Sequence, residues 1–278
     1  MRKHIIYPLL ALFLGVCGAL CYWKLMLGSG DSLPAPGEPI GIALLALCGA
    51  TLVLFLLLAL KSKGLQGGAL YTMPSTFRAV LLLGCAAGLL FSSMLHLKTV
   101  MDVMERGGSL LSCILELVLV VFAIPAMVSV AFLAKDAKAG TGRSHDSLTV
   151  LFPVLYGWFW LIDLYRRHSA NPVLWDYIFL LLAAIFLLLA AFGRAGFSFG
   201  DGKPRFTVFT CLCAIFLAPL SLLSYFDLPT LLATVGMTLY AAATLTALLR
   251  DLPMPEFPNP QEESDSEFEL ETEVSDDE

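Results

Sequence analysis

The segment IGIALLALCGATLVLFLLLAL, residues 40–60, runs for 21 residues without a charged side chain. The hydrocarbon core of a bilayer takes roughly 20 apolar helical residues to cross. Because no water reaches that core, the backbone of such a segment must satisfy its own hydrogen bonds, which favours a helix. We therefore predict that residues 40–60 form a transmembrane helix.

Seven further segments share this apolar character, and Gly, Pro or charged residues separate them. The eight predicted spans cover residues 5–27, 40–60, 77–97, 109–134, 148–165, 172–193, 206–226 and 229–250. The predicted fold class is all-α, a polytopic transmembrane helical bundle formed by residues 1–250. The first span follows two basic residues, as a signal peptide does, but its apolar run is longer than a signal core. We therefore expect it to be retained.

The last residues differ in composition from the rest of the chain. Hydrophobic residues make up 58% of the whole chain and charged residues only 14%, against roughly 25% charged residues in soluble domains. Yet residues 251–278 hold 12 of the 23 acidic residues and no Lys or Arg. Such a segment cannot bury enough apolar surface to fold alone, so it is predicted to be a disordered acidic cytoplasmic tail. The alternative is a docking segment for a basic cytoplasmic protein.

The basic residues predict the orientation of the spans, because cytoplasmic segments are enriched in Lys and Arg. With the amino terminus inside, the cytoplasmic segments hold 12 of the 17 basic residues and the outer segments hold 5. An even number of spans returns the carboxyl terminus to the cytoplasm. We expect a multi-pass protein of the plasma (cytoplasmic) membrane with both termini cytoplasmic. The basic residues are scattered singly between apolar helices, so nucleic-acid binding is not predicted.

Two patterns bear on how the spans pack. Tyr7-Pro8 opens the first span and Phe152-Pro153 opens the fifth, which is compatible with a four-plus-four parallel repeat. The alternative is that Leu- and Ala-rich helices resemble one another without duplication. In the third span, Gly84 and Gly88 form a G-x-x-x-G pattern, which permits close helix approach. We expect this pattern to serve packing within the chain more than dimerisation.

Ionisable side chains near or within the spans are candidates for function, because charges are costly in lipid and are usually kept for a purpose. The candidates are all predicted to lie on the outer side: Glu116, Asp163, His96, His168 and Asp176. Glu116 is expected roughly 10 Å below the outer end of the fourth span, from the rise of a helix. His96 closes the third span, His168 lies in a loop, and Asp176 begins the sixth span.

The fifth span also carries an aromatic face. Tyr156, Phe159 and Trp160 precede Asp163 by seven, four and three residues, which places them on one side of a helix with the carboxylate. Aromatic rings attract cations where water is excluded, so this face is a candidate site for a small-molecule or cation ligand. The alternative is that Asp163 pairs with Arg166 or Arg167 and that the rings only pack.

No catalytic, metal or cofactor site is predicted. His96, Glu116, Asp163, His168 and Asp176 could in principle bind zinc. However, the chain has no H-E-x-x-H motif, no phosphate-binding loop and no dinucleotide fingerprint. The seven cysteines all fall inside apolar spans, where Cys behaves as a small hydrophobe.

The turn Arg167-His168-Ser169-Ala170-Asn171-Pro172, with Trp175 and Tyr177 after it, together with the eight-span layout, resembles uncharacterised multi-spanning bacterial membrane proteins. The resemblance implies an eight-helix membrane fold and no particular activity. From the residues alone, the leading hypothesis is a small-molecule or ion transporter of permease type. The alternatives are a membrane-embedded regulatory or scaffold subunit acting through its tail, and an intramembrane enzyme.

Overall fold

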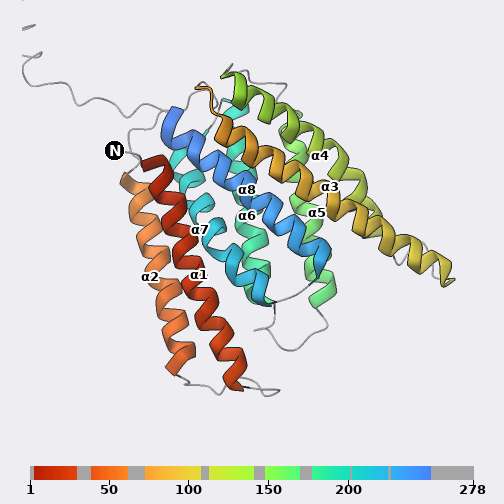
Figure 1. The fold of residues 1–278 in the computed structure, drawn as a ribbon, viewed down its shortest axis with the longest axis horizontal. Coiled ribbons are helices and arrows are strands. Elements are labelled where there is room, and N and C mark those ends of the chain that lie inside the picture. Colours follow the sequence, from red (N-terminus) through yellow and green to blue (C-terminus); the bar gives the residue numbers. More distant parts are fainter. Residues whose placement is uncertain are drawn as a thin grey trace, which may run out of the picture.

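Eight α-helices make up the described part of the protein, which contains no β-strand (Figure 1). The computed structural model describes residues 3–29, 39–61, 73–107, 113–140, 148–169, 177–200, 202–224 and 227–251. The helices are α1 (Lys3–Ser29), α2 (Pro39–Lys61), α3 (Thr76–Glu105), α4 (Ile114–Ala139), α5 (Leu151–His168), α6 (Ile178–Ser198), α7 (Pro204–Ser224) and α8 (Leu228–Asp251). The predicted acidic tail lies outside the described residues, except for Asp251.

Seven of the described helices are long and apolar enough to cross a membrane, so the chain is a multi-pass integral membrane protein. The helix outside this set is α5, which has 18 residues and carries Asp163, Arg166 and Arg167 in its last two turns. The fifth crossing therefore stays a prediction. Large hydrophobic side chains such as Phe13, Val53 and Phe192 are exposed on the outside of the bundle. An apolar exterior of this kind suits contact with lipid.

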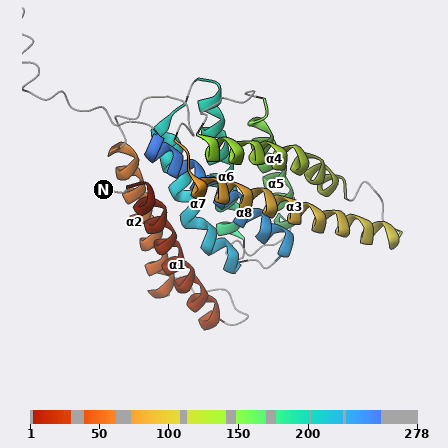
Figure 2. The same ribbon diagram turned by 45° about the horizontal axis from the view of Figure 1, so that its top comes forward.

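The helices pack in a bundle in which α8 lies between α1 and α3 (Figure 1). On one side α1 packs on α2 and α7, and on the other α3 packs along α4 and α8. Figure 2 shows α1 and α2 together at one edge and α3 reaching beyond the bundle at the opposite edge. A parallel repeat would match the α3–α8 pair with an α7–α4 pair, but the described parts of α7 and α4 form no interface of that kind. The four-plus-four repeat stays a prediction.

The closest approach of α3 and α8 occurs at two glycines. A Cβ atom built on Gly88 would lie 3.0 Å from the Cα of Gly236 and 3.0 Å from the carbonyl oxygen of Leu232. Only hydrogen side chains allow the two backbones to come this near. The G-x-x-x-G pattern of the third span therefore packs within the chain, on the eighth helix, as predicted.

Two helix boundaries differ from the prediction in ways that move candidate residues. Helix α3 continues to Glu105, because its polar last turns contain no helix breaker before Gly107, which ends it with φ of 78°. The described helix α4 begins at Ile114, five residues after the predicted start at 109. As a result, His96 lies inside α3, and Glu116 lies in the first turn of α4.

Candidate functional site: an acidic cluster around Arg167

Three carboxylates from separate segments converge on the guanidinium of Arg167, near the carboxyl-terminal end of α5. Nη2 of Arg167 lies 2.8 Å from Oδ2 of Asp163 and 3.2 Å from Oε1 of Glu116, and Nη1 lies 3.7 Å from Oδ2 of Asp227. We call Glu116, Asp163, Arg167 and Asp227 the acidic cluster. It joins the first turn of α4, the last turns of α5 and the residue that precedes α8.

Local helix geometry sets up each part of the acidic cluster. Asp163 and Arg167 are four residues apart on α5, so their side chains share one face of the helix. Asp227 caps α8, because its Oδ2 accepts a hydrogen bond of 2.9 Å from the Thr230 hydroxyl and its carbonyl accepts the Leu231 amide. A carboxylate also suits the first turn of α4, where the partial charge of the helix is positive.

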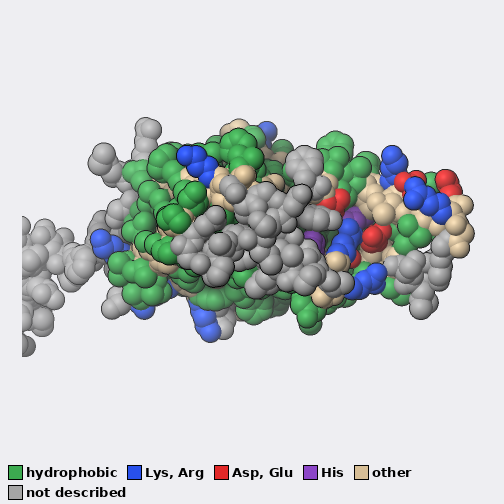
Figure 3. All heavy atoms as spheres, turned by 90° about the horizontal axis from the view of Figure 1, so that it is seen from below, with side chains coloured by type: hydrophobic (Ala, Val, Ile, Leu, Met, Phe, Trp, Pro, Cys, Tyr) green, Lys and Arg blue, Asp and Glu red, His purple; other side chains and the backbone are tan. Residues whose placement is uncertain are grey.

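Burial within the acidic cluster is graded. The Asp163 side chain is 4% exposed, that of Glu116 18%, and those of Arg167 and Asp227 27% each. The acidic cluster is therefore accessible from the end of the bundle, and Asp163 is its most deeply buried member. Figure 3, a view onto this end, shows acidic, basic and His side chains close together.

Charge and hydrogen bonding are not balanced within the acidic cluster. Three carboxylates face Arg167, and the exposed Arg166 also acts on Glu116. Counted as ionised groups, these three acidic residues exceed the two arginines by one negative charge. Oε2 of Glu116 and Nε2 of His96 are both buried without a hydrogen-bond partner in the described part of the chain. His96 is 2% exposed, and the charges of Arg167, Asp163 and Asp227 all act on it.

The aromatic face of α5 is divided between two neighbours. Tyr156 and Trp160 are 1% exposed and lie on the same buried face as Asp163. The Tyr156 hydroxyl lies beside that of Ser92 on α3, and Nε1 of Trp160 is buried without an acceptor among the described residues. Phe159 turns toward α4 instead, where its ring stacks on Phe122 with centroids 4.7 Å apart. Tyr156 and Trp160 therefore share the buried face of Asp163, whereas Phe159 packs on α4, so the three rings do not form one continuous aromatic face.

His168, Glu116 and Asp176, the other residues proposed from the sequence, differ in how their structural positions compare with the prediction. His168 was expected in a loop, but it is the last residue of α5, buried, with Nδ1 2.9 Å from the Leu164 carbonyl oxygen and its ring against Tyr177. The depth of Glu116 below the outer surface stays a prediction, and the described part of α4 begins two residues before it. Asp176 lies outside the described residues.

Sequence reasoning missed the central role of Arg167 and the membership of Asp227. The pairing of Asp163 with an arginine was an open alternative, and the structure selects Arg167 at i+4. Asp227 had a recognisable signal, since an Asp three residues before Thr230 at the start of a helix is a capping pattern. The predicted topology already placed that helix start on the same side as Glu116.

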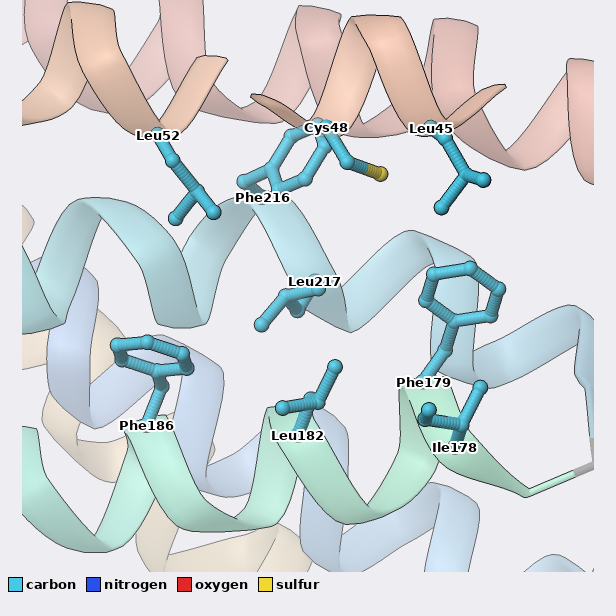
Figure 4. Close-up of a pocket in the computed structure, with 9 residues that line it drawn as sticks. All are labelled: Leu45, Cys48, Leu52, Ile178, Phe179, Leu182, Phe186, Phe216 and Leu217. Atoms are coloured by element: carbon cyan, nitrogen blue, oxygen red, sulfur yellow. The ribbon is translucent and has the colours of Figure 1, made fainter. Parts of the chain in front are cut away.

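Apart from the acidic cluster, an apolar pocket lies between α2, α6 and α7. It has a volume of about 350 Å³, and side chains from α2, α6 and α7 point into it (Figure 4). Its lining consists of Leu45, Cys48, Leu52, Ile178, Phe179, Leu182, Phe186, Phe216 and Leu217. No ionisable side chain other than the Cys48 thiol lines it, so it suits hydrocarbon and not a charged ligand.

The described residues contain no group of three or more His, Cys, Asp and Glu side chains arranged to hold a metal ion. A comparison of the chain with protein-family models, curated proteins and solved structures gave no match.

Proposed function

We propose that this protein is a permease-like transporter of a small molecule or an ion, and that the acidic cluster binds its cationic substrate or coupling proton. The observation that carries the proposal is the convergence of Glu116, Asp163 and Asp227 on the guanidinium of Arg167. Ionisable groups inside membrane domains typically mark ion and substrate pathways.

The unbalanced charge identifies the kind of ligand. A surplus carboxylate in a site of low dielectric attracts either a proton or a cation, because both neutralise it. Oε2 of Glu116 and Nε2 of His96, both without a hydrogen-bond partner among the described residues, are two polar atoms that such a ligand can contact. Trp160 adds a ring on the same side of α5, and ring faces attract organic cations.

The proposal includes a topology: eight crossings in the plasma membrane, with both termini cytoplasmic and the acidic cluster on the outer side. Single cysteines at Ser32 and Ser264, in a chain without its native cysteines, test it. We expect an impermeant thiol reagent applied to intact cells to label the variant at 32 and not the variant at 264. Labelling at both positions contradicts the topology.

Proton flux provides the functional test. The purified full chain is reconstituted in liposomes containing a pH-sensitive dye, and a potassium diffusion potential, negative inside, drives cations inward. We expect the lumen to acidify faster than in protein-free liposomes and Glu116→Gln to slow this at least tenfold, because glutamine cannot take up the proton. Glu105→Gln, the same change at an exposed position on α3 outside the cluster, serves as the matched control.

Two results would overturn the transport proposal. One is wild-type acidification equal to that of empty liposomes, both with protons alone and with tetraethylammonium or choline added as organic cations. The other is equal flux in the wild type and in Glu116→Gln, since the cluster would then lie off the pathway.

A structural or regulatory scaffold is the second candidate function, and one observation favours it. Arg167 lies within ion-pair distance of all three carboxylates, so the acidic cluster is also able to act as a clamp that ties α4, α5 and the start of α8 together. In that case the acidic residues 256–278 would engage a basic cytoplasmic partner. Their deletion should then abolish partner capture while the thermal stability of the bundle stays unchanged.

A further inference from the structure

A cavity of about 210 Å³ lies at the opposite end of the bundle, where α1 and α3 begin and α8 ends. Its lining consists of Ile5, Ser75, Phe77, Arg78, Thr246 and Arg250. We call it the arginine pocket. Its described lining has two guanidinium groups, two hydroxyl groups and two apolar side chains, and no carboxylate.

The two arginines differ in how firmly they are held. Arg78 is 1% exposed, and its guanidinium donates a hydrogen bond to the Met73 carbonyl oxygen, which fixes its position. Arg250 lies in the last turn of α8 and is exposed. One cation is thus preorganised inside the cavity while the other stands at its mouth, as suits capture of an anion that arrives from outside.

The start of α3 adds to the positive field of the arginine pocket. Ser75 is the amino-terminal cap residue, and its side chain makes no capping hydrogen bond. The first amide bonded within the helix is that of Ala79, to the Ser75 carbonyl. The amides of the first turn carry partial positive charge and can donate to an anion, as helix amino termini do for phosphate.

A row of partly exposed side chains on α8 leads toward the arginine pocket, and residues 243–248 that follow this row are buried. The outward positions of that helix recur every three or four residues and are at least partly exposed: Leu228, Leu231, Val235, Leu239 and Ala242. The next position in the series is Thr246, which lines the pocket. From Thr246 back to Val235 is roughly 16 Å along the helix axis, close to the half-thickness of a hydrocarbon core at about 15 Å.

Helices α1 and α3 border this row on both sides (Figure 1). Both flanking helices carry exposed apolar side chains in their first turns: Ile5 and Leu9 on α1, and Phe77 and Val80 on α3. This surface therefore combines the cationic arginine pocket with a row of apolar side chains about as long as one leaflet of the bilayer is thick. This shape and charge match a molecule with an anionic head and hydrocarbon tails.

We propose that the arginine pocket binds the phosphate headgroup of an anionic glycerophospholipid, with the acyl chains along α8 between α1 and α3. Arg78 and Arg250 pair with the headgroup, and the Ser75 hydroxyl, which makes no capping hydrogen bond, is available to donate to its oxygens. The Thr246 hydroxyl lines the same cavity but donates to the Ala243 carbonyl oxygen. Basic recesses between membrane helices commonly recognise anionic lipids. The site is separate from the acidic cluster, and its occupancy does not depend on the transport proposal.

Native mass spectrometry of the full chain, titrated with lipid in neutral detergent, tests the proposal. We expect dioleoyl phosphatidylglycerol to bind at least tenfold more tightly than dioleoyl phosphatidylcholine, which has the same tails and no net charge. Arg250→Gln should weaken phosphatidylglycerol binding about fivefold, the equivalent of about 1 kcal/mol for one basic side chain near the headgroups. Its phosphatidylcholine binding should not change.

Arg205→Gln is the matched control, since Arg205 is exposed at the same end of the bundle, on α7, outside the pocket. It should bind both lipids as the wild type does.

Arg78→Gln should lose at least as much affinity as Arg250→Gln. Arg78 is buried, so the Arg78→Gln variant can fail to fold. In that case the lipid binding of Arg250→Gln alone tests the proposal. Equal binding of the two lipids, or an equal loss in Arg205→Gln, overturns the proposal. So does full displacement of phosphatidylglycerol by millimolar inorganic phosphate, which would indicate a site for a free anion.

Discussion

The two ends of the bundle carry opposite charge and are built differently. At one end, three carboxylates surround Arg167. At the opposite end, Arg78 and Arg250 line one cavity with no carboxylate in its described lining. The acidic cluster holds its opposite charges in direct contact, whereas the arginine pocket presents like charges to a shared space.

This difference shows what each end requires to be stable. Opposite charges that touch neutralise one another, so the acidic cluster is sensitive to loss of either partner. In the arginine pocket, the proposed lipid headgroup would be an anionic partner for both guanidinium groups. We therefore expect mutations in the acidic cluster to change folding and mutations in the arginine pocket to change the response to lipid.

The largest effect is expected from Arg167→Met. Removing the shared cation leaves three carboxylates facing one another, and breaking a buried pair in this way costs about 3 kcal/mol or more. Thermal unfolding in detergent measures the loss. An unfolding temperature equal to that of the wild type would show that Arg167 does not hold the three carboxylates together.

A somewhat smaller effect is expected from Gly88→Leu, at the middle of the α3–α8 interface that connects the two ends. The new side chain meets backbone atoms of α8 at close distance, so the helices must separate at a cost of about 1–3 kcal/mol. Gly49→Leu is a control on α2, where an added Cβ meets nothing within 4 Å. Equal destabilisation of both variants would show that the close approach of α3 and α8 is not a constraint.

Glu116→Gln should change stability little, by about 1 kcal/mol or less, because Arg167 keeps two other carboxylates and the amide oxygen still accepts a hydrogen bond. Its expected effect is on proton flux. Glu116→Leu keeps no acceptor and should destabilise more. If Gln and Leu destabilise equally, the hydrogen bond to Arg167 contributes nothing.

The smallest effect on stability without lipid is expected from Arg250→Gln, within about 0.5 kcal/mol, as for other exposed positions. Added phosphatidylglycerol should raise the unfolding temperature of the wild type by more than that of this variant. An equal rise in both would remove the contrast between the two ends. Arg167→Met should retain the full lipid response on top of its lower stability.

Much of the helical architecture followed from local composition. All eight helices form where apolar runs were predicted, and the seven that qualify as spans do so on length and apolarity alone. The errors lie at helix ends, where polar residues such as those between His96 and Glu105 remain helical without being apolar. The role of Gly84 and Gly88 in packing was also predictable, because no other residue permits that approach.

The sequence by itself determined that the chain is a helical membrane protein, because a backbone in lipid must satisfy its own hydrogen bonds wherever an apolar run is long enough. Only the tertiary structure decided which polar groups meet. Glu116, Asp163 and Asp227 reach Arg167 from separate segments, and Arg78 and Arg250 share a cavity although 172 residues separate them. These juxtapositions depend on how α3, α4, α5 and α8 pack against one another, and the composition of one helix does not encode its neighbours.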